Sequence, residues 1–192
     1  MTYLVLGLVI FLGAHSVRMV AGGWRTRTRS SLGEGAYKGI YALVSLLGLA
    51  LIIWGFGAAR QQPVQLWSPP VAMRHVAALL TLIAFVLLAA AYVPGNGIKA
   101  RVHHPMVLGV KVWALAHLLA NGTLAHVVLF GSFLAWAVWN FIASRKRDRT
   151  DDVRYPPGRA GATVLTVVAG LVAWAVFALL LHGWLIGVKP LG

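Results

Sequence analysis

Long apolar runs separated by short polar segments extend along the whole chain, and this pattern predicts a membrane protein. A helix needs roughly 20 apolar residues to cross about 30 Å of hydrocarbon. The apolar runs that have this length, or nearly so, cover residues 2–21, 38–59, 73–93, 104–120, 123–143 and 162–185. They do not alternate as the strands of a membrane barrel would. We therefore predict an all-α fold, a polytopic membrane helix bundle with about six transmembrane helices.

The composition supports this prediction and leaves no room for a soluble domain. Hydrophobic residues make up 59% of the chain, and the mean hydropathy is +0.79. We expect residues 1–192 to form a single transmembrane domain. The first apolar run has neither a basic region before it nor a small-residue cleavage site after it, so we expect a retained helix rather than a signal peptide.

The charges sit mainly in the segments between the apolar runs and predict the orientation. Most of the 17 Lys and Arg residues fall in the first, third and fifth loops, including Arg25, Arg101 and Arg145. The positive-inside rule places these loops in the cytoplasm and both termini outside. The basic loops lack interleaved aromatic residues, so we expect membrane lipid and not nucleic acid as a partner.

Cysteine and acidic residues are scarce, and this scarcity excludes several functions. The absence of cysteine removes disulfides, c-type haem attachment and thiol nucleophiles. The only carboxylates belong to predicted cytoplasmic loops: Glu34, Asp148, Asp151 and Asp152. A carboxylate proton relay at the membrane midplane and a catalytic carboxylate pair are therefore not expected.

The chemistry that remains is that of histidine. The chain has seven of them: His15, His75, His103, His104, His117, His126 and His182. Ionisable groups inside membrane helices are candidates for function, and neutral imidazole is a common haem ligand. Most of the seven also fit as interfacial residues near helix ends, whereas His15 and His117 lie further inside their runs. A b-type haem is the cofactor that this residue set supports best.

Geometry requires such a haem to bridge helices. His104 and His117 are separated by about 20 Å along one helix and by about 220° around it. They cannot bind one iron. Lys111 and Arg18 either extend toward the headgroups or pair with a haem propionate. Trp113 is a candidate for the pocket wall or for an interfacial belt.

Glycines recur on the predicted helices, and two interpretations fit them. Gly7, Gly13, Gly35, Gly39 and Gly48 allow either ordinary close packing of helices or close approach to a flat ligand. Close packing of helices is the more common use of such residues, and we expect it here.

Two motifs connect the chain with a family. "YLVLGLVIFLGAHSVRMVA" and "HHPMVLGVKVWALAHLLANG" resemble the bacterial NnrU family over essentially the whole chain. That family is similar to plastid 15-cis-zeta-carotene isomerase, a b-type haem membrane protein. The resemblance implies His15 and His117 as the metal ligands, with His104 at the "HP" turn. It also implies a role in nitric oxide and nitrogen-oxide metabolism, in denitrification, and a location in the bacterial inner membrane.

Helix depth leaves the second axial ligand open. His15 lies toward the cytoplasmic half of its helix, and His117 lies close to the opposite tip. The uncharged tip "ANGTLAH" is expected to end inside the membrane as a partial hairpin, which would lower His117 toward His15. The other candidates for the second ligand are His104, His126, His75 and His182. An alternative pairing uses the outer set His75, His117, His126 and His182.

Other functions fit the same residues. A haem-dependent cis-trans isomerase would act on an apolar polyene. The run His104, Pro105, Gly109 and Trp113 also resembles membrane methyltransferases of the isoprenylcysteine and phospholipid type. That resemblance implies S-adenosylmethionine at the "HHP" turn, but the acidic pair of those enzymes is replaced by Asp148, Asp151 and Asp152. A cofactor-free assembly subunit is a further alternative. Catalytic residues, redox partner and oligomeric state are not predicted.

Overall fold

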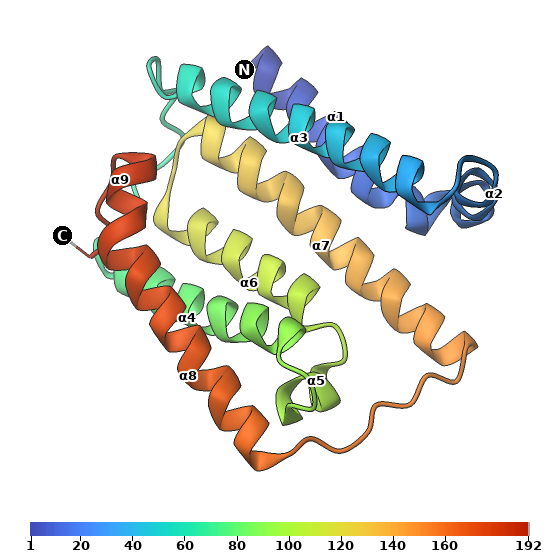
Figure 1. Ribbon diagram of the computed structural model, residues 1–192. Coiled ribbons are helices and arrows are strands. Elements are labelled where there is room, and N and C mark those ends of the chain that lie inside the picture. The colour runs from blue at the N-terminus through green and yellow to red at the C-terminus, as the bar shows by residue number, and fades with distance from the viewer. Residues whose placement is uncertain (192) are drawn as a thin grey trace. The chain divides into compact units, whose positions relative to one another are not determined.

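The computed structural model describes residues 1–191, and helices make up most of that stretch. Figure 1 shows them in order: α1 (Thr2–Val20), α2 (Gly22–Leu32), α3 (Glu34–Ala59), α4 (Ala72–Tyr92), α5 (Gly97–Val102), α6 (Pro105–Ala120), α7 (Leu124–Thr150), α8 (Ala160–Val176), the π-helix η1 (Phe177–Leu181) and α9 (His182–Ile186). Within residues 1–191 the only β pairing consists of isolated bridges, Gln65 with Thr123 and Asn96 with Arg159.

Five helical segments are long and apolar enough to cross a membrane: α1, α3, α4, α7 and the continuous stretch Ala160–Ile186. The predicted all-α polytopic membrane fold is confirmed. The fourth predicted span, residues 104–120, corresponds to α6, which has 16 residues. At about 1.5 Å per residue it is about 24 Å long, less than the hydrocarbon thickness. This length agrees with a tip that ends inside the membrane, which stays a prediction.

The fifth predicted span ends too early. We predicted residues 123–143, but α7 continues to Thr150 through the basic and acidic residues that we had assigned to a loop. The prediction followed hydrophobicity, whereas Arg, Lys and Ala are good helix formers whatever the solvent around them. Asp148 therefore lies on the last turn of a long helix rather than in a loop. Two short helices, α2 and α5, also occupy predicted loops.

The chain divides into two compact units, and each is described by itself. The first contains Met1–Leu66 and Thr123–Trp136, and the second contains Trp67–Gly122 and the chain from Ala137 onward. Helix α7 begins in the first unit and ends in the second. The prediction of one domain stays a prediction.

Glycines hold α1 against α3 in the first unit. A Cβ on Gly7 would lie 2.6 Å from the backbone N of Ile52, and one on Gly48 would lie 2.8 Å from the backbone N of Phe11. A Cβ on Gly55 would collide with the backbone of Leu4. Ordinary helix packing is thus confirmed for Gly7 and Gly48. Among the described residues 1–191, Gly13, Gly35 and Gly39 have no such neighbour within 4 Å.

In the second unit, α4 packs against both α6 and α8. A Cβ on Gly109 of α6 would lie 3.1 Å from the Ala84 carbonyl of α4, and one on Gly170 of α8 would lie 2.6 Å from the Val86 Cα. The Trp174 indole N–H donates to the Thr81 hydroxyl at 3.1 Å. These contacts place three helix backbones close together, as small residues permit in membranes.

A buried asparagine closes the turn after α4. Asn96 is 2% exposed. Its side-chain amide donates to the carbonyls of Ala90 and Val93, and its Oδ1 accepts from the Lys99 N–H at 2.7 Å. The Gly97 N–H donates to the Thr163 hydroxyl of α8 at 2.8 Å. This turn fixes where α5 starts, and therefore where the following "HHP" turn lies.

Candidate functional site

The "HHP" turn lies between α5 and α6, and its conformation follows from its residues. His103 ends α5 with φ 66°, a left-handed value that is uncommon for a residue with a side chain. His104 is the N-cap of α6, and Pro105 occupies the first turn, where its missing N–H costs nothing. The predicted helix start at this turn is confirmed.

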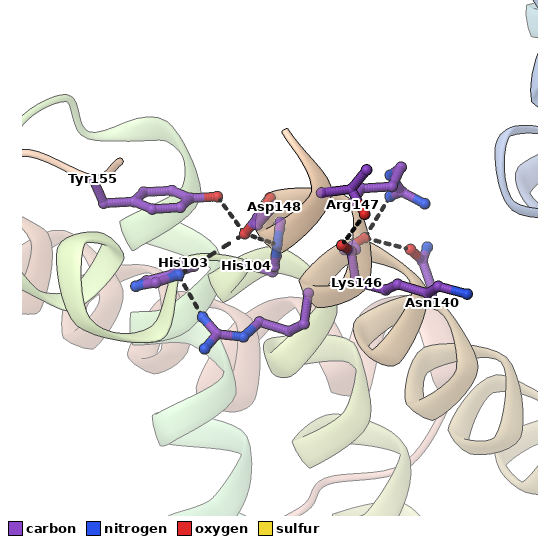
Figure 2. Close-up of polar contacts among 10 residues, drawn as sticks. His103, His104, Asn140, Lys146, Arg147, Asp148 and Tyr155 are labelled. Carbon is purple, nitrogen blue, oxygen red and sulfur yellow. Dashed lines mark hydrogen bonds and ion pairs between the residues drawn. The ribbon is translucent and has the colours of Figure 1, made fainter. Parts of the chain in front are cut away.

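A carboxylate from α7 joins this turn. The His104 Nε2–H donates to Oδ2 of Asp148 at 2.8 Å, and the Tyr155 hydroxyl donates to the same oxygen at 3.0 Å (Figure 2). The side chains of His104 and Asp148 are 20% and 15% exposed. Because a carboxylate only accepts, the contact fixes the proton of a neutral His104 on Nε2.

His103 completes this cluster through a different set of contacts. The Arg145 guanidinium donates to Nδ1 of His103, so that this nitrogen is the acceptor. The His103 ring stacks on Tyr155 with 4.1 Å between ring centroids. Burial and the hydrogen bond to Asp148 raise the pKa of Tyr155 above its ordinary value. We call His103, His104, Arg145, Asp148 and Tyr155 the HHP cluster.

Lys111 lies near the HHP cluster on α6. Its Nζ is 5.2 Å from the ring centroid of Phe141, and the same ring lies 6.2 Å from the His104 ring. A cation–π contact of this kind holds an ammonium group in an apolar setting. The ammonium group of Lys111 therefore has a partner within the protein, the Phe141 ring. Its contact with a haem propionate stays a prediction.

His15, predicted as a metal ligand, lies on α1 in an aromatic setting. Its Nδ1–H donates to the Phe11 carbonyl one turn earlier, at 2.7 Å. Phe11 stacks on the imidazole with centroids 4.2 Å apart, and Tyr41 and Trp136 lie at 5.4 and 6.2 Å. This hydrogen bond leaves Nε2 as the nitrogen with the lone pair. Arg18 lies exposed one turn further along α1.

His117, the second predicted metal ligand, repeats this arrangement on α6. Its Nδ1–H donates to the Trp113 carbonyl one turn earlier, at 2.8 Å. The Trp113 and His117 rings are 5.2 Å apart. Asn121 donates to the His117 carbonyl at 2.9 Å. His15 belongs to the first unit and His117 to the second, and their pairing stays a prediction.

The other histidines of the alternative set differ in exposure and contacts. His126 bonds Thr123 at 2.6 Å and meets the edge of Phe56. His182 donates from Nδ1 to the Val188 carbonyl at 2.7 Å. His75 is exposed at the start of α4.

Helix geometry weighs against a pairing of His15 with His126 in the first unit and of His75 with His117 in the second. His15 lies beside Trp136, which is about 15 Å beyond His126 along α7. In α4, Ala84 faces Gly109 of α6, and His75 lies about 180° around α4 from Ala84. His75 therefore points away from α6, the helix that carries His117.

Among residues 1–191, no three or more His, Asp or Glu side chains form a group that could hold a metal ion. A b-type haem would need only two histidines to hold its iron, and no larger cluster. The donor chemistry of His15 and His117 fits that need, since each Nε2 is the lone-pair nitrogen when Nδ1 carries the proton.

The comparisons with known proteins decide the family. The model of the NnrU family, described as NnrU protein, matches residues 3–190, nearly the whole chain. The chain belongs to the NnrU family. No curated protein and no solved structure matches the chain at a significant level. The resemblance that the sequence motifs indicated is thus confirmed, and the match runs through both compact units.

Sequence reasoning missed most of the HHP cluster. It named His103 and His104 but treated Asp148 as a loop residue, and it gave Arg145 and Tyr155 no role beyond their loop. These residues are distant from the "HHP" turn in the chain, and only the length of α7 brings them back to it. The grouping of Asp148, Asp151 and Asp152 around the end of α7 was the available signal.

Proposed function

We propose that this NnrU family protein binds a b-type haem through His15 and His117 and acts in nitrogen-oxide metabolism. The observation that carries the proposal is the shared arrangement of the two imidazoles. Each donates its Nδ1–H to a backbone carbonyl one turn earlier. Histidines that bind metals commonly fix their other ring nitrogen in this way, which orients the ring and raises the basicity of the ligating nitrogen.

The surroundings of the two histidines support the same proposal. Aromatic rings flank both imidazoles, and both lie in apolar helices. An apolar, aromatic wall suits the flat face of a porphyrin and controls the access of solvent to the iron. His104 is a poorer ligand in this respect, because its Nε2–H is committed to Asp148.

When bound, the haem would supply electron transfer or the binding of nitric oxide. Two histidine ligands favour electron transfer or ligand exchange over open-site oxygen chemistry. The nitrogen-oxide role and the bacterial inner membrane are what the family resemblance implies. The protein's own residues would hold the iron, orient the imidazoles and exclude water.

The test is an absorption spectrum of the detergent-purified protein, oxidised and then reduced with dithionite. Wild type, His15→Ala and His117→Ala are expressed with ample haem. We expect sharp reduced α and β bands in the wild type and their loss in both variants, because each removes one of the two histidines that would hold the iron. His104→Ala is the matched control and should keep the bands.

Each other outcome overturns part of the proposal. Retention of the six-coordinate spectrum in either ligand variant would move the ligation to His126, His75 or His182. The absence of a Soret band in every sample would contradict haem binding and would favour the other functions. Binding of S-adenosylmethionine that depends on His104 would then favour a methyltransferase-like protein, and turnover of a polyene would favour an isomerase.

A further inference from the structure

A small cavity adjoins the HHP cluster in the second unit. Its volume is ≈ 210 Å³, and it is lined by Ala91, Lys99, His103, His104, Pro105, Met106 and Val107. These residues come from the end of α4, from α5 and from the start of α6. Three of them carry a basic nitrogen and none carries a carboxylate. The cavity therefore has the lining of an anion site.

The charges around the cavity reinforce this character. Lys99 Nζ has a long contact of 3.4 Å with the Ala91 carbonyl at the end of α4. A contact of that length is readily exchanged for a stronger, charge-assisted hydrogen bond. The Arg145 guanidinium lies against His103. Oδ2 of Asp148 already accepts hydrogen bonds from His104 and Tyr155, and it lies 3.9 Å from Nδ1 of His103.

The start of α6 adds N–H donors. Pro105 has no N–H, and His104, at the N-cap, makes no side-chain hydrogen bond to the first turn. The amides of a first helical turn have no acceptor within the helix, and the helix dipole favours negative charge there. Met106 and Val107, which belong to this turn, line the cavity.

The place of the cavity along the helices indicates where the anion comes from. Ala91 is at the last turn of α4, a helix long and apolar enough to cross the membrane. Helix ends of this kind lie at the level of the lipid headgroups. We propose that the cavity binds the phosphate of an anionic phospholipid headgroup, with Lys99 and His103 as the principal side-chain contacts. Basic pockets beside membrane helices on the cytoplasmic side bind such headgroups.

The test is native mass spectrometry of the detergent-purified protein titrated with phosphatidylglycerol or with phosphatidylcholine. The variants are Lys99→Gln, Lys99→Arg and the control Lys189→Gln, which removes an equal charge from the opposite predicted face of the membrane. We expect tighter binding of phosphatidylglycerol in the wild type. Lys99→Gln should weaken it about fivefold, since one Lys near the surface contributes about that factor. Lys99→Arg and Lys189→Gln should retain it.

Four results would overturn the proposal. Equal affinity for the two lipids would show that the protein does not select an anionic headgroup. An unchanged affinity of Lys99→Gln for phosphatidylglycerol would show that the cavity is not the binding site. An equal loss of affinity in Lys189→Gln would show the same. Tight binding of inorganic phosphate that depends on Lys99 and displaces no lipid would identify a soluble phosphate as the ligand. None of these readouts involves haem, so they test the lipid site independently of the haem proposal.

Discussion

His15 lies inside an apolar helix and His104 lies at the N-cap of another, and their surroundings use the imidazole in opposite ways. His15 donates from Nδ1 to a carbonyl of its own helix and is surrounded by aromatic rings. His104 donates from Nε2 to a carboxylate on another helix, next to Tyr155 and Arg145. The first arrangement is local to one turn of helix. The second depends on residues that fold back from far along the chain.

This difference separates two functions that a histidine can have in a membrane protein. A bond to the preceding turn orients the ring and leaves the outer nitrogen for a ligand. A bond to a carboxylate uses that outer nitrogen and ties two helices together. Perturbing α1 and α3 should therefore affect His15 alone, and perturbing Asp148 should affect the HHP cluster alone.

The largest expected effect comes from Gly48→Leu. The side chain would collide with the backbone of Phe11, whose carbonyl accepts from His15. We expect a loss of about 3 kcal/mol, the upper end of overpacking costs, because backbone cannot yield as a side chain does. The thermal midpoint in detergent measures it. Gly39→Leu on the same helix is the control, since nothing lies within 4 Å of a Cβ there. An equal loss in both variants would contradict the packing argument.

A smaller effect is expected from Asp148→Ala. It leaves His104 and Tyr155 without their common acceptor, and an unsatisfied, partly buried polar group costs about 1–3 kcal/mol. Thermal unfolding and the rate of proteolysis within residues 151–159 should both report the loss, with the environment of His15 unchanged. Asp151→Ala is the matched control because Asp151 is exposed and follows the same helix. If the two variants behaved alike, the HHP cluster would not hold α7.

The smallest effect is expected from Tyr155→Phe, which keeps the ring stacked on His103 and removes one hydrogen bond. The cost should be about 1 kcal/mol below pH 10. Because the folded state raises the pKa of Tyr155 above 10.0, this contribution is present below that pH and is lost as the pH rises through the folded pKa. The pKa of Tyr155 is measured from the absorbance of tyrosinate against pH, as the difference between the wild type and Tyr155→Phe. A pKa at or below 10 would contradict the contact with Asp148.

The amino-acid sequence by itself determined the membrane helices, the helix start at "HHP" and the family. Hydrophobic runs of sufficient length have one solution in lipid, because only a helix satisfies its own backbone. Pro105 marks a helix start for a similarly local reason. The hydrogen bonds of His15 and His117 to their own helices belong to this local class as well, although the predictions did not include them.

The tertiary structure alone decided what surrounds these residues. Hydrophobicity ended the fifth span at residue 143, and so it missed that Arg145 and Asp148 continue the helix and reach the "HHP" turn. It could not tell Gly48, which packs on Phe11, from Gly39, which packs on nothing. Which residues meet across helices depends on the register between them, and register is set by the fit of many side chains at once rather than by any one segment.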